Sequence, residues 1–320
     1  MTSPYPQASA DRDRWILGLR GPRNPLDLRR SYAAFLEEEV SESGAVVSVA
    51  TLLLTNHECP WRCLMCDLWQ NTLPGDTAPG AIPEQIRLAL SVLPAASRIK
   101  LYNAGSFFDA KAIPPEDDEV IARLLEPFDR VIVESHPALV GDRCWLLQKR
   151  LGGRLEVAMG LETVHPEVLP RLNKRMTLAR FRRAADFLRG HGIALRSFVL
   201  VGLPWVAAEE TPAWTLRAIE FAFDCGSGAV SLIPTRAGNG AMKALQDSGD
   251  FRPPSLGMLE SAAEQGLALR RGRVFADLWN LETFSRCSAC FPARAQRLRE
   301  MNLRQAAPAR IDCDSCGATA

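Results

Sequence analysis

Three closely spaced cysteines are the residues of this chain best suited to chemistry. Cys59, Cys63 and Cys66 stand within eight residues, in the run CPWRCLMC. Thiolates packed this closely can face one polynuclear metal centre. Four cysteines would complete an iron–sulfur cube, so a [4Fe-4S] cluster held by three leaves one iron open to a non-protein ligand. The motif therefore predicts a cluster that performs chemistry as well as storing electrons.

A zinc site and a chance group of cysteines are the alternative interpretations of this motif. Zinc sites usually bring two pairs of ligands together, with the fourth ligand close by. The nearest further candidate is His57, which lies too close to Cys59 in the sequence to close a tetrahedron comfortably. The spacing therefore favours the iron–sulfur interpretation.

A second cysteine group follows about 220 residues later. Two C-x2-C pairs, separated by 22 residues, are formed by Cys287, Cys290, Cys313 and Cys316. Four thiolates in two such pairs predict a closed structural zinc site, with an auxiliary iron–sulfur cluster as the alternative. The segment 286–311 also contains six arginines and one acidic residue, Glu300. Such a module can contact phosphates, although a solvated helix face is the commoner role of these charges.

The elements that must position these cysteines alternate between strands and helices. Strands are expected at 46–54, 98–103, 130–135, 155–161, 194–201 and 228–233, and helices at 82–93, 116–126, 141–150, 178–190 and 209–224. This alternation is typical of βα units, whose right-handed crossovers give a parallel sheet with helices on its outer face. Six units predict an α/β fold: a partial (β/α)6 barrel with parallel strands, plus a small C-terminal cysteine-rich module.

Three regions are expected along the chain. Residues 1–44 are predicted to form a polar leader, to about residue 25, and a helical extension containing YAAFLEEEV. The barrel core spans 45–284, and the four-cysteine metal-binding module spans 285–320. Chemistry in such barrels takes place at the C-terminal ends of the strands. The first cysteine motif directly follows the first predicted strand, where this rule places a site.

Composition narrows the class of protein. The chain has 320 residues, 47% of them hydrophobic, and a net charge of +1. It can bury a large core, and no global field attracts it to nucleic acid or to an anionic membrane. The N-terminus has no apolar signal region, and no apolar run is long enough to span a membrane. Cysteines grouped as metal ligands fit a reducing compartment, so we expect a cytoplasmic location without membrane association.

Small and acidic residues follow the second, third and fourth predicted strands. Ala104, Gly105 and Ser106 would let a ligand approach the backbone closely, and a plain tight turn is the alternative. Glu134 and Glu162 end the next two strands, where carboxylates can bind cationic groups or transfer protons. An ion pair with Lys174 or Arg175 is the structural alternative for these acids.

The fifth and sixth predicted strands end in a different kind of turn. Gly202 follows the fifth strand in the run VGLPW, and Arg236 follows the sixth in a glycine-rich loop. An apolar strand followed by a bare backbone turn suits stacking and edge hydrogen bonds to an adenine. We therefore expect both residues to contribute to a cofactor pocket.

The C-x3-C-x2-C spacing resembles the signature of the radical S-adenosylmethionine (SAM) enzymes. The segments LYNAGSFFD, VIVESHP, GLETVHPE and LVGLP extend this similarity over roughly residues 45–270. Their order and spacing are similar to the branch that contains the archaeosine synthase radical-SAM subunit and, more distantly, the Elongator catalytic subunit and the tRNA methylthiotransferases. In this superfamily the open iron binds SAM, and the reduced cluster cleaves it to methionine and a 5′-deoxyadenosyl radical.

The resemblance implies an enzyme that abstracts hydrogen from a substrate carbon. Its cofactors would be a [4Fe-4S] cluster and SAM, and its electron donor a protein such as flavodoxin or ferredoxin. The substrate would be a nucleoside in tRNA, as in the best-understood members, or alternatively a small-molecule metabolite. A non-catalytic RNA-binding or cluster-carrying protein is the remaining alternative. The missing fourth ligand argues against it, because an inert carrier would normally saturate its cluster.

Overall fold

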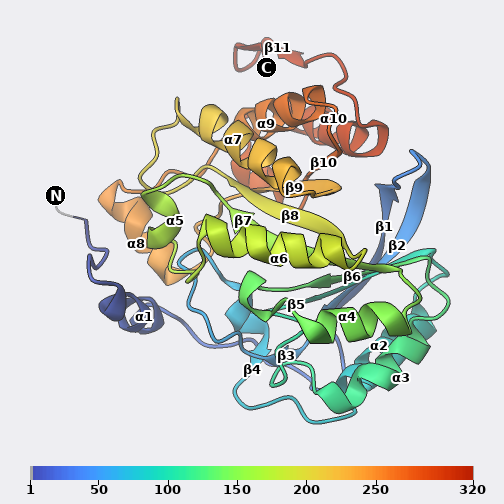
Figure 1. Cartoon of the computed structure of the whole chain (residues 1–320). Coiled ribbons are helices and arrows are strands. Elements are labelled where there is room, and N and C mark those ends of the chain that lie inside the picture. The colour runs from blue at the N-terminus through green and yellow to red at the C-terminus, as the bar shows by residue number, and fades with distance from the viewer. Residues whose placement is uncertain (1–2, 320) are drawn as a thin grey trace.

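A single curled sheet forms the centre of the molecule in the computed structural model, which describes residues 3–319 (Figure 1). The strand order is β1-β2-β5-β6-β7-β8-β9-β10. All neighbours from β2 to β10 run parallel, and β1 alone is antiparallel, pairing with β2. The strands are β1 (Ala33–Val40), β2 (Val46–Leu54), β5 (Arg98–Asn103), β6 (Arg130–Glu134), β7 (Leu155–Glu162), β8 (Ala194–Val201), β9 (Ala229–Pro234) and β10 (Arg273–Ala276).

Helices cover the outer face of this sheet. They are α2 (Ala81–Val92), α3 (Asp118–Leu124), α4 (Asp142–Arg150), α6 (Leu178–Gly190), α7 (Thr211–Asp224), α9 (Leu256–Ala268) and α10 (Phe291–Arg304). Alternate strand residues, such as Leu101 in β5 and Val157 in β7, point into the core beneath them and are fully buried. The partial α/β barrel predicted from the sequence is thus confirmed, and the six expected strands lie within a residue or so of their predicted limits.

Short helices and short strands lie in the loops between the strands of the sheet and near the two ends of the chain. They are α1 (Ser9–Gly18), α5 (Val168–Arg171), α8 (Gly240–Ser248), η1 (Leu68–Asn71), η2 (Pro115–Asp117), η3 (Pro137–Leu139), η4 (Leu281–Phe284), β3 (Asn56–His57), β4 (Thr72–Leu73), β11 (Asp312–Cys313) and β12 (Ala318–Thr319). Among the described residues, no helix is long and apolar enough to cross a membrane.

The prediction of a helix in YAAFLEEEV is wrong, because residues 33–40 form strand β1. Three successive glutamates favour a helix in isolation. In the fold, a tight turn in which the Ser41 amide donates to the Ala45 carbonyl (2.8 Å) returns β2 alongside β1. Glu39 then lies buried against Arg196 and Lys100, and the partly exposed Glu37 also pairs with Lys100. Tertiary ion pairs therefore override the local helical preference.

The expected polar leader is also more structured than predicted. Residues 9–18 form helix α1, although the segment is mostly hydrophilic. Tyr5 and Ile16 are buried in a small cluster with Met242 and Leu245 of α8. The leader therefore packs over the C-terminal ends of the strands, close to the cysteine loop.

A seventh parallel strand, β10, was not predicted, since four residues give too short a pattern. Its outer edge is covered by α10 rather than left open. The side chains of Asn302 and Gln305 each donate to and accept from the backbone of β10, at Ala276 and Val274, over 2.7 to 2.9 Å. These contacts satisfy backbone groups that an exposed edge strand would leave unpaired.

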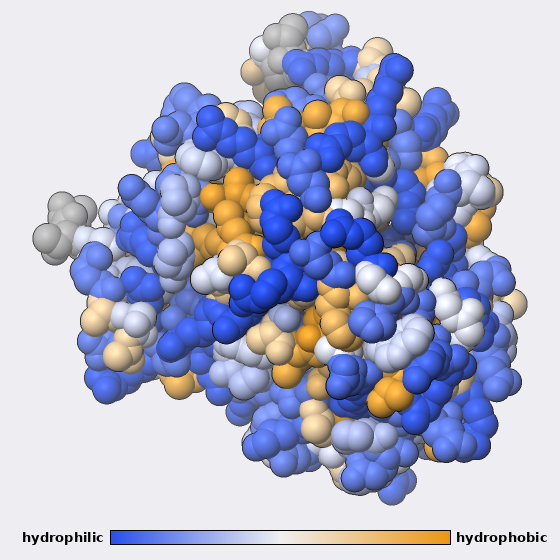
Figure 2. Space-filling view, viewed as in Figure 1, coloured by the Kyte–Doolittle hydropathy of each residue, from blue (hydrophilic) through white to orange (hydrophobic). Residues whose placement is uncertain are grey.

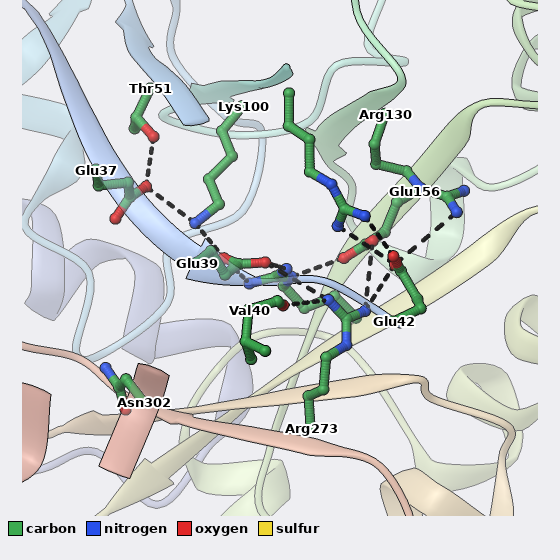
Figure 3. A network of polar contacts seen from close by, with 12 residues as sticks. Glu37, Glu39, Val40, Glu42, Thr51, Lys100, Arg130, Glu156, Arg273 and Asn302 are labelled. Atoms are coloured by element: carbon green, nitrogen blue, oxygen red, sulfur yellow. Dashed lines mark hydrogen bonds and ion pairs between the residues drawn. The ribbon is translucent and has the colours of Figure 1, made fainter. Parts of the chain in front are cut away.

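A buried ion network closes the barrel at the N-terminal ends of its strands (Figure 3). Arg196 of β8 donates to Glu156 of β7 (2.7 Å) and to Glu39 of β1 (2.9 Å). Arg273 of β10 reaches across to the Val40 carbonyl (3.1 Å), which ties together the two edge strands. Burial opposes ionisation of Glu39, but Arg196 and Lys100 hold the pKa of that carboxyl well below its usual range. The network leaves the opposite end of the barrel as the place for a site.

Candidate functional site

The loop carrying Cys59, Cys63 and Cys66 follows β2 at the C-terminal end of the sheet, as the sequence predicted. Two asparagines from distant segments hold its backbone. Asn173 donates to the Arg62 carbonyl (2.8 Å), and Asn239, at the start of α8, donates to the Leu64 (3.0 Å) and Cys66 (2.9 Å) carbonyls. These three hydrogen bonds hold the backbone of the loop in place.

The three thiols of this loop suit a metal centre. Burial raises the pKa of Cys59 to about 11, that of Cys66 to about 12, and that of Cys63 well above its usual range. The thiolates of Cys59 and Cys66 add to the effect on Cys63, so the three groups lie close together. Buried thiolates need cationic partners, which iron ions supply. Among the described residues, only the C-terminal cysteines gather ligand atoms within 4.8 Å, so this trio is spaced more widely than a single-ion site.

The loop after β5 packs directly against the cysteine loop. Gly105 has a φ of 152°, and a Cβ there would lie 3.1 Å from the Cβ of Cys59. Ala104 is buried, and the hydroxyl of Ser106 hydrogen-bonds that of Ser135 at 3.0 Å. This segment can therefore offer backbone groups to a ligand, while the Ser106 hydroxyl is already engaged inside the protein.

A buried ion pair between Lys174 and Glu162 lies beside the cysteines. Burial disfavours the charge on Lys174, but Glu162 and the Cys63 thiolate raise the pKa of this lysine. A Cβ on Gly160 would come within 2.1 Å of both charged groups, so a side chain there would displace the ion pair. Glu162, Asn173 and Arg175 all have positive φ values, of 64°, 56° and 59°. Such strained conformations cluster at functional sites.

Glu134 ends β6 without an ion-pair partner within residues 3–319. Burial raises the pKa of Glu134 to about 8, although a hydrogen bond from the Asn103 backbone acts in the opposite direction. The amide oxygen and nitrogen of the Asn103 side chain are both buried without a hydrogen-bond partner in this part of the chain. Such groups are costly unless something satisfies them. Glu134 and Asn103 therefore place unused hydrogen-bonding groups at the strand ends, which a polar ligand could satisfy.

The ends of β8 and β9 border the same mouth of the barrel. Gly202 has a φ of 77°, and a Cβ there would lie 2.8 Å from Pro254. Arg236 donates to Asp277 (2.9 Å) and to the Trp279 carbonyl. The hydroxyl of Thr235 is buried and has no partner among the described residues. The predicted site residues therefore converge on one end of the sheet, and their contacts with a cofactor remain predictions.

Sequence reasoning missed an aromatic stack on the cysteine loop. Trp61, between Cys59 and Cys63, stacks on His136 with ring centroids 3.6 Å apart. His136 accepts from the Ala138 amide through Nδ1 (3.1 Å), so its Nε2 donates to the Lys174 carbonyl (3.0 Å). Burial and the Lys174 charge lower the pKa of His136 to about 3, and the ring is neutral. His136 directly precedes Pro137, a position where a histidine side chain often caps a turn, but nothing in the sequence pointed to Trp61.

The four C-terminal cysteines form a second candidate metal centre. Their sulfur atoms all lie within 4.8 Å of one another, with 3.9 Å between Cys287 and Cys313 and 4.0 Å between Cys290 and Cys316. Backbone hydrogen bonds lower the pKa of Cys287 to about 7, which favours the ligand form of this thiol. The group can thus bind a metal ion.

Half of the arginines in this C-terminal segment have structural roles. Arg294 and Arg297 are buried on α10 and pair with Glu260 and Glu264 of α9. Arg310 also pairs with Glu264, at 2.7 Å. These three charges are neutralised within the protein, so the basic composition of the segment overstates its capacity for phosphates.

No family model matches the chain, but its sequence is similar to those of known proteins. It is 25% identical to archaeosine synthase subunit beta of Methanosarcina acetivorans over 233 residues, which cover 68% of this chain and 66% of that protein. It is 21% identical to an uncharacterised protein of Methanocaldococcus jannaschii over 250 residues, covering 73% of this chain and 68% of the relative.

Among solved structures, Elp3 of Methanocaldococcus infernus shares the fold. The TM-score is 0.52 at 15% identity, and the match covers 79% of this chain and 64% of the Elp3 chain. These similarities confirm the resemblance that the cysteine motif and the strand-end segments indicated, to the radical SAM branch that contains the archaeosine synthase subunit.

Proposed function

We propose that this protein is a radical SAM enzyme. The observation that carries the proposal is the loop of three closely grouped, partly buried thiols at the C-terminal ends of the strands, packed against the backbone of Gly105. Three thiolates leave one iron of a four-iron cluster for SAM. Unsatisfied polar groups at the neighbouring strand ends, on Asn103 and Thr235, support a polar cofactor in the same place.

The residues of the chain take distinct parts in this proposal. When bound, the cluster and SAM supply the reductive cleavage that yields a 5′-deoxyadenosyl radical. Cys59, Cys63 and Cys66 hold the cluster. The backbone of Ala104–Gly105 would bind the amino acid end of SAM, and the Glu134 carboxylate would lie beside its cationic sulfonium. The turn at Gly202, which cannot carry a side chain, faces the adenine.

Glu134 gives a pH-dependent prediction. Its carboxyl group has a pKa of about 8 without ligand, so it is mostly neutral at pH 7 and ionised at pH 9. The sulfonium group of SAM keeps its positive charge at both pH values and favours the ionised form of Glu134. The affinity of the wild-type protein relative to Glu134→Gln should therefore rise about tenfold from pH 7 to pH 9. Titration calorimetry of SAM with both proteins at both pH values measures this ratio, and a constant ratio would place Glu134 outside the SAM contact.

We propose a tRNA nucleoside as the substrate. The similarity to archaeosine synthase subunit beta supports this choice, although the match spans 66% of that protein. A small-molecule metabolite is the second candidate, favoured by the net charge of only +1. Inventories of modified nucleosides and of small metabolites from cells with and without the gene distinguish the two. Loss of one tRNA nucleoside with accumulation of its precursor is the expected result, whereas a change confined to metabolites would favour the second candidate.

We also propose zinc at the C-terminal cysteines. Tetrahedral zinc with Zn–S bonds of about 2.3 Å separates its sulfur ligands by about 3.8 Å. The separations of 3.9 and 4.0 Å match this value. A four-iron cube holds its thiolates further apart, because each binds a different corner.

Removing two of these thiolates should remove zinc alone. The double variant Cys287→Ala/Cys290→Ala is expected to contain about one zinc ion fewer per chain, with an unchanged iron content, because the two metal centres share no ligand. Elemental analysis of the two proteins measures both. A loss of iron from the variant, with no zinc in the parent protein, would instead indicate an auxiliary cluster.

A further inference from the structure

A groove with a mixed apolar and basic lining lies on the outer face of the barrel, between η3 and α6. Its cavity has a volume of about 360 Å³. Pro137, Ala138 and Val140 form one wall, and Ala184 and Phe187 of α6 form the other. Figure 2 shows hydrophobic surface bordered by hydrophilic side chains on the face where α6 lies in Figure 1.

Two arginines complete the lining of this groove. Arg180 and Arg183 are exposed on successive turns of α6, and neither has a carboxylate partner among the described residues. Arg189, further along the same helix, pairs instead with Asp186. No acidic residue lines the groove. The groove therefore presents two positive charges without carboxylate partners beside its apolar walls.

The groove is connected to the cysteine loop by direct contacts. Pro137 follows His136, whose ring stacks on Trp61 at 3.6 Å. Trp61 in turn stands between Cys59 and Cys63 in the sequence. The wall of the groove at Pro137 is therefore linked to the cysteine loop through the stack of His136 on Trp61.

We propose that an acidic electron-transfer protein docks on this groove and reduces the cluster from there. The inference rests on the proposed function, which needs an external source of single electrons. One electron leaves the reduced donor, which is oxidised, and enters the cluster, which is reduced. The donor's carboxylates pair with Arg180 and Arg183, while an apolar side chain beside them fills the groove. Small, charge-steered interfaces are typical of redox encounters.

The apolar walls of the groove favour a protein over an RNA as the occupant. Phosphates would use the arginines but leave Phe187 and Val140 without a partner. Protein interfaces, in contrast, combine apolar contacts with arginine at their centre. A protein in this groove would also leave the C-terminal ends of the strands free for the substrate, because α6, which forms one wall of the groove, covers the outer face of the sheet (Figure 1).

Charge reversal on α6 tests the proposal. Reconstituted wild-type protein is compared with Arg180→Glu/Arg183→Glu and with the control Arg182→Glu, which changes a charge on the same helix at an arginine that lies over the Phe221 ring. The probe is reduced flavodoxin. Its binding is measured by titration at several salt concentrations, and reduction of the cluster by stopped-flow absorbance. Dithionite, which needs no docking surface, is the control reductant.

The double variant should bind flavodoxin at least about tenfold more weakly at low salt, and the difference should shrink as salt screens the charges. Cluster reduction by flavodoxin should slow accordingly, while reduction by dithionite and the behaviour of Arg182→Glu stay unchanged. Unaltered flavodoxin binding would overturn the proposal, and so would weakened binding of tRNA alone. If wild-type protein reduced by dithionite fails to cleave SAM, the proposed function fails, whatever the docking result.

Discussion

Cys63→Ala protein should contain no [4Fe-4S] cluster after anaerobic reconstitution and should lose all cleavage of SAM. Cys63 is the central cysteine of the motif, and the remaining pair, Cys59 and Cys66, cannot hold a four-iron cluster with two bonds. Wild-type protein should instead show the broad absorption near 400 nm that iron–sulfur clusters give. Iron analysis and absorption spectra of the two proteins check the prediction.

Cys144→Ala is the matched control for this experiment. Cys144 is buried in α4, at a distance from the cysteine loop, and burial raises the pKa of its thiol to about 12. Its removal should leave the iron content and the SAM cleavage unchanged. Full iron content in Cys63→Ala would contradict the assignment of the loop as the cluster site.

Arg196→Met should lower the free energy of unfolding by about 3–5 kcal/mol, since breaking a buried ion network leaves uncompensated charges. Arg196 is 1% exposed and is the shared partner of Glu39 and Glu156. Methionine can fill part of the space but leaves both carboxylates without this cation. Urea unfolding at pH 7, followed by circular dichroism, measures the loss.

Arg271→Met provides the comparison. Arg271 pairs with Asp224 on the surface, where both side chains are about half exposed, and its loss should cost at most about 1 kcal/mol. Equal effects of Arg196→Met and Arg271→Met would show that the buried network does not stabilise the barrel.

The buried network also predicts how the stability of the protein depends on pH. The pKa of Glu39 is lower in the folded protein than in the unfolded chain. The stabilising effect of the ionised Glu39 is therefore complete at neutral pH and is lost as the pH falls below about 4.5.

The sequence predicted the parts of the fold that depend on local pattern. Apolar runs of strand length alternate with amphipathic helices, so six strands and the position of Cys59–Cys66 after the first of them followed directly. The convergence of Glu134, Glu162 and Gly202 at one end also followed, because parallel strands place their C-terminal ends together.

Features that depend on contacts between residues far apart in the chain could not be predicted from the sequence pattern. Residues 33–40 carry a helical composition, and only their pairing with β2 and with Arg196 makes them a strand. Asn173 and Asn239 hold the cysteine loop from positions more than 100 residues away, and no sequence pattern marks them. The stack of Trp61 on His136 is equally a product of tertiary packing.

Cleavage of SAM by the reconstituted protein is the most direct test of the proposed function. Anaerobic protein with about four irons at Cys59, Cys63 and Cys66 is mixed with SAM and dithionite, and the products are separated by liquid chromatography. The three-thiolate site predicts 5′-deoxyadenosine and methionine in equal amounts, formed only when the reductant is present. Protein that holds the cluster but forms no 5′-deoxyadenosine under these conditions would contradict the assignment as a radical SAM enzyme.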